Sequence, residues 1–352
     1  MNVKFSNRAL ASQFPPNVLT PWSVVRYSWN MVGGPDKAVL NAPLTVDKWD
    51  AFKLLRCGVE IFDRGRCVWW GYVHKITIPH GDLKVGLSMD NLYNSVAVTY
   101  SELETASTVS SGQAMTAYAT DLMSIAEFGT KQYMLSISNA TPTQAAYQRD
   151  VMLGTNKYPI ATVDMGSGKQ IEIECRGWWD TLAWKYYSNT STVVTETTAQ
   201  IAAIIASAGQ FITQTQVMSA SGIFTNPYRE NIVNSLTEVE SLLKGGTTAG
   251  KRLLATVTRD RSVLINEIPA QAARYFMDQG GKLVWPANKQ LLVEPPCLVG
   301  VWVGLKDVPL VLGGLTTVKE FFIESAEYNV QSGKTNYKPL GQADTLAVTR
   351  IA

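Results

Sequence analysis

A run of short alternating segments, joined by turn residues, constrains the fold of this chain more than any other feature. In "LKVGLSMD" (residues 83–90), apolar side chains alternate with polar or small ones. This period of two is typical of a β-strand with one buried face. The turn sequences "DRG" (63–65) and "PHGD" (79–82) supply the residues that tight turns need. Residues 57–90 therefore predict an antiparallel meander.

Helices are predicted in the middle of the chain by capping-box spacing, in which Ser or Thr precedes Glu or Gln by three residues. The paired residues are Thr141 and Gln144 in the segment 141–154, Thr197 and Gln200 in 197–209, and Ser235 and Glu238 in 235–246. Pro142 also suits the first helical position. A further helix is predicted to end at Gly129.

The β pattern resumes in "KQIEIECRGWWDTLAWKYY" (169–187), where Ile171, Ile173 and Cys175 share one face. Further β-like segments follow beyond residue 250. The predicted fold class is α+β and rich in β-structure, with strand-rich blocks around a central helical and loop region.

An internal echo appears when the sequence is shifted by 86 residues. The matched pairs are Val85 with Ile171, Leu87 with Ile173, Met89 with Cys175, Leu92 with Trp178, Val96 with Leu182 and Tyr100 with Tyr186. One interpretation is that two related β units were built into one chain. The other is that any two strands followed by amphipathic segments align this well.

The stretch "GGTTAGKR" (245–252) differs by one residue from a phosphate-binding loop, whose pattern is G-x-x-x-x-G-K-[ST]. That loop works only where a strand enters it and a helix leaves it. Here a predicted helix enters and a predicted strand leaves, and Arg252 replaces the hydroxyl residue that would hold magnesium. We interpret the glycines as a helix stop and a flexible loop.

No metal or cofactor site is predicted. His74 and His80 are the only histidines, and six extended residues separate them by about 20 Å. The four cysteines show no C-x-x-C spacing. Counting pairs from the "DRG" turn places Cys67 opposite Ile61 and Cys57 opposite Gly71, so these thiols do not face each other. We expect all four cysteines to be reduced packing residues.

No catalytic residues are predicted either, because no G-x-S-x-G elbow occurs and no pair of carboxylates is marked out. The 29 acidic residues leave a glycoside or peptidoglycan hydrolase as an open alternative. Asp180 beside Trp178 and Trp179 forms the best sugar-like cluster, since aromatic faces stack on pyranose rings. A carbohydrate-binding protein is therefore a second alternative.

Charge and hydropathy limit the kinds of partner that this chain is expected to bind. The 31 basic and 29 acidic residues give a net charge of +2 without a long basic run, which does not support sequence-specific nucleic-acid binding. No apolar stretch approaches the roughly 18 residues of a membrane span, and no signal peptide is evident. We expect synthesis in a cytoplasm.

Aromatic residues are abundant, with 10 Trp, 14 Tyr and 10 Phe. Such side chains stabilise sheet faces and subunit contacts. We therefore name one candidate cluster, which either belongs to the core or forms an interface. Its members are Trp69, Trp70, Trp178, Trp179 and Trp184.

Several motifs occur in a characteristic order. They are "CVWWGYVHKI" and "LKVGLSMDNLYNSVAVTY", then "SIAEFGTKQYMLSISNATPTQAAYQRDVMLGTNKYP", "IECRGWWDTLAWKYY", "GKRLLATVTRDRSVLINEIP" and "FIESAEYNVQSG". This layout resembles phage tail proteins of the tail-tip or baseplate-hub kind, over most of residues 22–340.

The resemblance implies two tail-tube-like antiparallel β domains or barrels in a virion structural protein at the tail tip. As a homotrimer, such a hub joins the tail tube to the tip and surrounds the DNA path. Implied partners are further copies of itself, a tail tube or distal tail protein, a tape-measure protein and other tail-tip or fibre proteins. A distal-tail or adaptor ring of six copies is the nearest alternative.

Four segments are expected on this basis. Residues 1–105 form a first β-rich tube-like domain, completed by strands near 168–190. Residues 106–167 form a helix-containing insertion, and residues 168–250 add a strand and a helical region. Residues 251–352 form a second β-rich domain.

Overall fold

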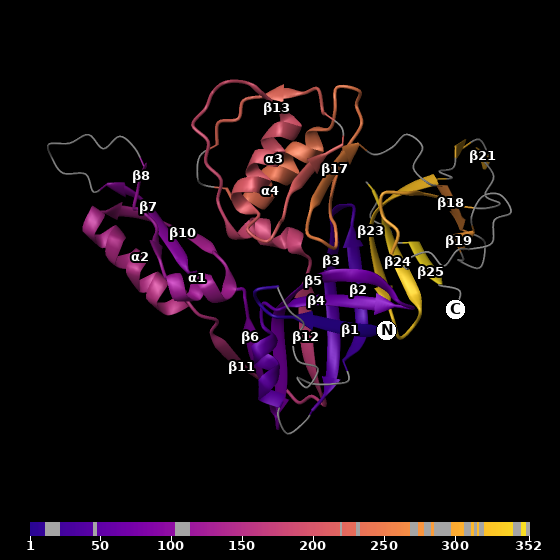
Figure 1. Ribbon diagram of the computed structural model, residues 1–352, viewed down its shortest axis with the longest axis horizontal. Coiled ribbons are helices and arrows are strands. Elements are labelled where there is room, and N and C mark those ends of the chain that lie inside the picture. Colours follow the sequence, from indigo (N-terminus) through magenta and orange to yellow (C-terminus); the bar gives the residue numbers. More distant parts are fainter. Residues whose placement is uncertain are drawn as a thin grey trace.

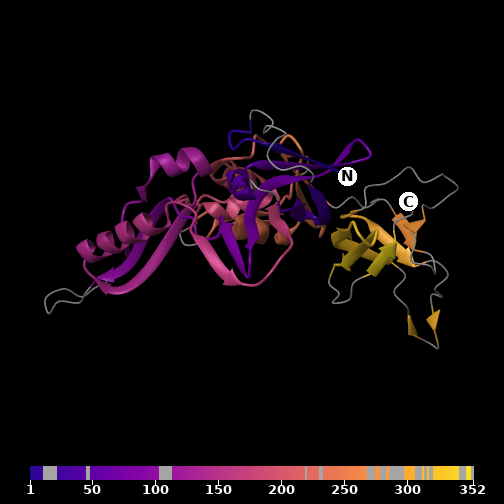
Figure 2. The ribbon, with the colours of Figure 1, turned by 90° about the horizontal axis from the view of Figure 1, so that it is seen from below.

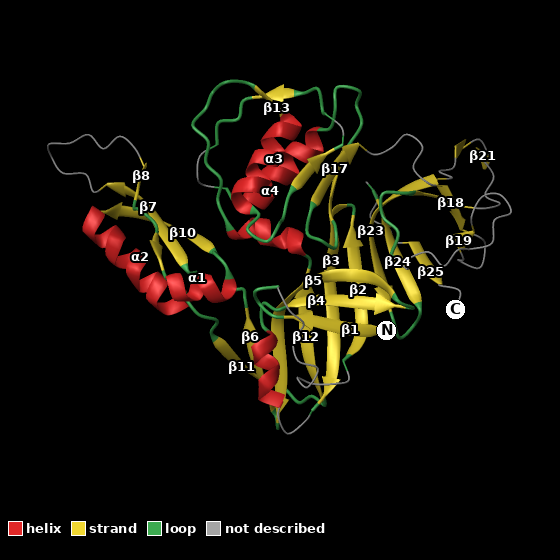
Figure 3. Cartoon of the chain, in the orientation of Figure 1, coloured by secondary structure: helices red, strands yellow, loops and turns green. Residues whose placement is uncertain are grey.

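The computed structural model describes residues 1–10, 22–44, 48–102, 113–218, 220–229, 233–267, 274–277, 283–284, 297–305, 311–312, 315–316, 320–340 and 346–349. The fold is α+β and rich in antiparallel strands, as predicted (Figures 1 and 3). Figure 2 shows a small α/β unit at one end of the molecule and the C-terminal strands at the other. No helix in the described ranges is long and apolar enough to cross a membrane.

The body of the molecule is a curved sheet. Its strands are β1 (Asn2–Ser6), β2 (Ser23–Asn30), β3 (Val32–Pro43), β4 (Gly58–Asp63), β5 (Arg66–His80), β6 (Leu83–Ser88), β11 (Ala161–Met165) and β12 (Gln170–Arg176). Antiparallel ladders connect β11, β6, β5, β12, β3 and β2 in that order. Strand β1 pairs with β4, and Phe5 meets Trp22 at the entrance to β2, with ring centroids 5.7 Å apart.

The predicted meander is confirmed, because β4, β5 and β6 form two successive hairpins. Arg64 (φ 49°) and Gly65 (φ 81°) make the first turn in the left-handed region. The cysteine register was wrong: Cys67 lies opposite Phe62, one residue from the predicted Ile61, and Gly71 lies opposite Val59, two residues from the predicted Cys57. The turn pairs Asp63 with Arg66, which accounts for one residue, and a register shift between Ile61 and Phe62 adds the second.

The two echoed strands, β6 and β12, lie in the same sheet. Ile76 of β5 has Leu87 of β6 as its register partner on one side and Ile173 of β12 on the other. The echo therefore marks two strands that flank β5, and it does not mark two separate sheets. Ile171, Ile173 and Cys175 are all buried in the core, as their shared face predicts.

A small α/β unit projects from the body (Figure 1). It contains β7 (Ser95–Glu102), β8 (Gln113–Met115), β9 (Ala119–Thr120), α1 (Leu122–Phe128), β10 (Gln132–Ala140) and α2 (Pro142–Asn156). The capping box of Thr141 and Gln144 forms as predicted. Helix α1 ends before Gly129. The parallel ladder between β7 and β10 is the core of this unit.

A helical unit follows β12. Its elements are the 3-10 helix η2 (Trp178–Trp184), β13 (Thr195–Glu196), α3 (Thr197–Ala208), β14 (Thr215–Val217), β15 (Phe224–Thr225), α4 (Ser235–Gly245), β16 (Leu253–Val257) and β17 (Val263–Glu267). The β pattern predicted through residue 187 was wrong beyond Arg176, because Gly177 leads directly into η2.

Both capping boxes predicted in this unit were wrong by one residue. Helix α3 is capped by Glu196, and the Thr197 hydroxyl instead donates to the carbonyl of Ile223 at 2.9 Å. Helix α4 is capped by Asn234, and the Ser235 hydroxyl donates to the carbonyl of Lys185 at 2.9 Å. In each case a tertiary hydrogen bond occupies the hydroxyl that sequence spacing assigned to the cap.

Most of the C-terminal strands extend the sheet from β2, whereas β21 (Val311–Leu312) and β22 (Leu315–Thr316) form a separate two-stranded sheet. The others are β18 (Arg274–Met277), β19 (Leu283–Val284), β20 (Trp302–Leu305), β23 (Glu320–Asn329), β24 (Lys334–Pro339) and β25 (Leu346–Thr349). Strand β23 pairs with β2, and β24 and β25 follow in order. The four-segment division remains a prediction, and residues 285–296 of its last segment lie outside the described ranges.

Candidate functional site

The five tryptophans of the candidate cluster lie in or against one core. Trp178 and Trp179 are only 4% and 5% exposed, Trp69 and Trp184 are also buried, and Trp70 packs at the margin. Tyr72 joins two of them, with its ring centroid 5.4 Å from that of Trp178 and 5.5 Å from that of Trp184. Protein atoms therefore occupy the indole faces that a sugar ring would need.

Two glycines let η2 enter this core. A Cβ on Gly177 would lie 1.7 Å from the carbonyl oxygen of Pro35, so no larger residue fits between β12 and η2. A Cβ on Gly33 would lie 2.6 Å from the Trp179 ring, and Gly33 also has a positive φ of 98°. The backbone thus approaches closely where the tryptophans turn inward.

Asp180 belongs to a polar network inside the molecule. The Tyr72 hydroxyl donates to Asp180 Oδ2 at 2.6 Å, and Arg176 Nη1 donates to Asp180 Oδ1 at 3.1 Å. His74 Nε2 lies 2.7 Å from Asp90 Oδ1, and the Ser88 hydroxyl donates to Asp90 Oδ2 at 2.7 Å. The carboxylate that the sequence associated with sugar binding therefore has two protein partners.

Burial shifts the pKa values of several groups in and around this network. It lowers the pKa of His74, and the nearby Arg176 lowers it further, although Asp90 opposes the change. Burial and the Asp180 carboxylate raise the pKa of Tyr72 well above its usual value. Burial also lowers the pKa of Lys131 to about 8. The Lys131 ammonium donates to the carbonyl of Asp90 at 3.1 Å, so it connects the small α/β unit to the network.

The two histidines lie at different places in the structure. His74 is in the polar network, whereas His80 Nδ1 lies 3.0 Å from the Lys48 ammonium. Within the described ranges, no group of three His, Cys, Asp or Glu could hold a metal ion. All four cysteines are free thiols.

The glycine stretch 245–252 has the order of elements that the sequence predicted. Helix α4 ends at Gly245, and β16 begins at Leu253. Gly246 and Gly250 have φ values of 72° and 71°, which suits a helix stop and a turn. A phosphate would meet the carboxyl-terminal end of a helix here, where the helix dipole is unfavourable for an anion.

Strand β11 is an exposed sheet edge that the sequence interpretation missed. It pairs with β6, and every one of its five residues is exposed. Val163 and Met165 are 61% and 83% exposed. The alternation of Ala161, Val163 and Met165 with Thr162 and Asp164 was the available signal, but five residues were too few to stand out.

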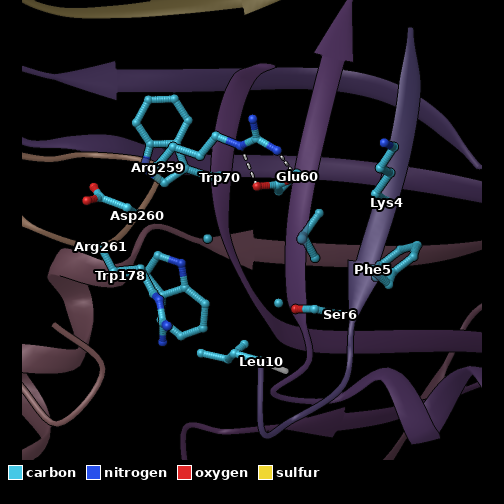
Figure 4. Close-up of a pocket in the computed structure, with 13 residues that line it drawn as sticks. Lys4, Phe5, Ser6, Leu10, Glu60, Trp70, Trp178, Arg259, Asp260 and Arg261 are labelled. Atoms are coloured by element: carbon cyan, nitrogen blue, oxygen red, sulfur yellow. Dashed lines mark hydrogen bonds and ion pairs between the residues drawn. The ribbon is translucent and has the colours of Figure 1, made fainter. Parts of the chain in front are cut away.

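A pocket of about 460 Å³ lies between β1, β4, β5 and the turn that joins β16 to β17 (Figure 4). Phe5, Leu10, Trp70 and Trp178 line its apolar part. Its charged residues are Lys4, Glu60, Arg259, Asp260 and Arg261. The sequence interpretation missed this site because its walls come from segments that are up to about 250 residues apart.

No protein-family model matches the chain, and no curated protein sequence matches it. Several solved structures are similar to it, three of which follow. The 43 kDa tail protein of prophage MuSo2 from Shewanella oneidensis has 9% identity and a TM-score of 0.40, over 99% of this chain and 96% of that one. A prophage tail protein from Listeria monocytogenes has 9% identity and a TM-score of 0.41, over 93% and 90%.

The third similar structure is an Escherichia coli component of the type VI secretion system, itself described as structurally similar to T4 bacteriophage tail proteins. It has 10% identity and a TM-score of 0.40, over 100% of this chain and 77% of that one. All three descriptions mention phage tail proteins.

Proposed function

We propose that this chain is a non-enzymatic structural protein of a phage tail tip, a hub that joins the tail tube to the tip around the DNA path. The single observation that carries the proposal is the exposed edge strand β11. Val163 and Met165 present apolar surface there, beside a row of backbone groups that no described strand pairs. Such an edge is a template for pairing with another chain.

The arrangement of strands favours a ring. The antiparallel path that begins at β11 continues through β2 to β23, β24 and β25, so its two ends are different surfaces. Contact between unlike surfaces is heterologous, and heterologous contacts form a ring where the rotation between copies closes. We infer three copies, as the resemblance to tail-tip hubs implies. A six-membered adaptor ring would use the same edge.

The carbohydrate-binding alternative loses the residues that motivated it. Trp178 and Trp179 are buried, and Asp180 is held by Tyr72 and Arg176. A carbohydrate-binding role would therefore need other residues. An architectural role uses the surface that the chain exposes.

Quantitative mass spectrometry of purified particles tests the proposal. We expect three copies of the chain in each tail, and antibodies against it should label the tail tip. Particles that assemble and infect without the chain would contradict the proposal.

A further inference from the structure

The pocket between β1, β4 and the turn from β16 to β17 combines apolar walls with unbalanced charge (Figure 4). Its volume of about 460 Å³ is of the size that binds small ligands or one or two side chains. Trp70, which is partly buried, provides apolar surface, and Phe5, Leu10 and the largely buried Trp178 also line the pocket. The pocket is distinct from the exposed edge strand β11.

Both carboxylates in the pocket already have partners. Arg259 holds Glu60 through two hydrogen bonds, at 2.6 and 2.8 Å. Asp260 accepts a hydrogen bond from the Ser262 hydroxyl at 3.0 Å, and another from Thr258. Arg261 has no ion-pair partner among the residues that the structure describes, and the Lys4 ammonium lies 4.7 Å from the ring centroid of Phe62. The pocket therefore retains positive charge.

Arg261 occupies a backbone position that glycine would fill without strain. Its φ is 67°, and the turn around it is closed by hydrogen bonds from Thr258 N to Ser262 O at 2.8 Å and from Arg261 N to Thr258 O at 3.0 Å. A side chain in this left-handed region costs conformational energy, and such strain concentrates at functional sites.

A second arginine with a positive φ, Arg56, lies near Trp178 of the pocket. Arg56 has a φ of 65° and is only 4% exposed, and its guanidinium carbon is 5.8 Å from the Trp178 ring centroid. Its Nη2 donates a hydrogen bond to the carbonyl of Arg8 at 2.6 Å, but its Nε and Nη1 are buried without a hydrogen-bond partner. A buried cation that lacks an anion is costly.

We propose that this pocket binds an acidic peptide segment of a protein partner. The carboxylate would lie against Arg261, and an adjacent apolar side chain would pack on Trp70, which is only partly buried. The anion would offset the positive charge that Arg56 and Arg261 concentrate on one side of the site. The apolar walls favour a peptide over a simple oxyanion, because phosphate would leave them uncovered.

Calorimetric titration of the full chain tests this proposal with N-acetyl-leucine, which carries one carboxylate and one apolar side chain. We expect a dissociation constant in the millimolar range, typical of a fragment. N-acetyl-leucinamide differs only in lacking the carboxylate and should bind at least about tenfold more weakly. Inorganic phosphate should also bind at least about tenfold more weakly.

The decisive variant is Arg261→Gly, because glycine accepts the positive φ and preserves the turn. It should bind N-acetyl-leucine at least about tenfold more weakly than the wild type does. The matched control is Arg64→Gly, which removes the same charge from a left-handed position in the exposed turn between β4 and β5. It should retain wild-type affinity.

Three results would overturn the proposal. The first is equal binding of the acid and the amide, and the second is wild-type affinity in Arg261→Gly. The third is phosphate binding as tight as that of N-acetyl-leucine, which would assign the site to a simple oxyanion. The titration uses isolated chain, so its outcome is independent of the proposed tail-tip assembly.

Discussion

His74 Nε2 lies 2.7 Å from Asp90 Oδ1, and this contact connects β5 to the residues that follow β6. Tyr72, Lys131, Arg176 and Asp180 are further titratable groups near this pair. The imidazole is buried whereas the Asp90 side chain reaches solvent, so the protein disfavours the charged form of His74.

The first prediction concerns pH. Because the pKa of His74 is lowered in the folded protein, the unfolded chain binds more protons just below pH 6.5. The free energy of unfolding should therefore fall as the pH drops from 6.5 towards the lowered pKa, by at most about 1.4 kcal/mol per pH unit. Calorimetry between pH 5 and pH 7 measures this slope.

The two histidines provide a matched pair of variants for that experiment. His74→Gln should remove most of the slope, and His80→Gln should keep it, because His80 is exposed near Lys48. An unchanged slope in His74→Gln would assign the pH dependence to other groups.

The second prediction concerns the tryptophan core. Trp178→Ala should lower the free energy of unfolding by about 3–5 kcal/mol, because it removes a buried ring that packs on Tyr72 and Phe211. Chemical denaturation followed by circular dichroism measures the change. Trp49→Ala is the control, because that ring is 43% exposed, and it should cost much less. Equal effects of the two substitutions would refute a core role for Trp178.

The third prediction contrasts two glycines. Gly177→Ala should destabilise the protein by more than about 2 kcal/mol, because the new methyl group would collide with the carbonyl of Pro35. Gly154→Ala should stabilise it by about 0.5–1 kcal/mol, because a Cβ there meets nothing within 4 Å and alanine favours the helix. Thermal denaturation of both variants provides the comparison. A stable Gly177→Ala variant would mean that β12 and η2 are less closely packed than described.

Local sequence patterns correctly predicted the elements that short-range features specify, such as tight hairpins and a self-capped helix. The hairpins of β4, β5 and β6 follow from alternation and turn residues, and α2 follows from Thr141, Pro142 and Gln144. The caps of α3 and α4 could not be placed from spacing alone. Glu196 caps α3 because its carboxylate also accepts a hydrogen bond from the Ser221 backbone at 2.8 Å, a tertiary contact.

Pairings between distant segments were beyond the reach of the sequence. The ladder between β3 and β12 joins Leu40 to Ile173, and the parallel ladder between β7 and β10 crosses two intervening strands and a helix. Neither pairing follows from the local periodicity of the strands involved. Alternation shows which face of a strand is buried, but it does not identify the strand with which it pairs.

The candidate tryptophans could be selected from the sequence, but their burial could not. From the sequence, Trp178 and Trp179 could belong either to the core or to an interface. The close approach of η2 to the sheet at Gly177 and Gly33 places them in the core. The polar network was missed because Tyr72, Asp90 and Asp180 come from three separate segments. No spacing rule connects them.

The central claim is that copies of this chain complete the sheet edge at β11. Sedimentation equilibrium of the wild-type chain and of a Val163→Lys, Met165→Lys variant tests it most directly, because lysine on an edge strand opposes pairing with another strand. Met123→Lys is the control, since Met123 is 75% exposed and belongs to α1 rather than to β11. We predict a trimer for the wild type and the control, and a dissociation constant raised by at least about tenfold in the double variant. A wild-type chain that stays monomeric at every concentration, or a double variant that assembles as the wild type does, would contradict the claim.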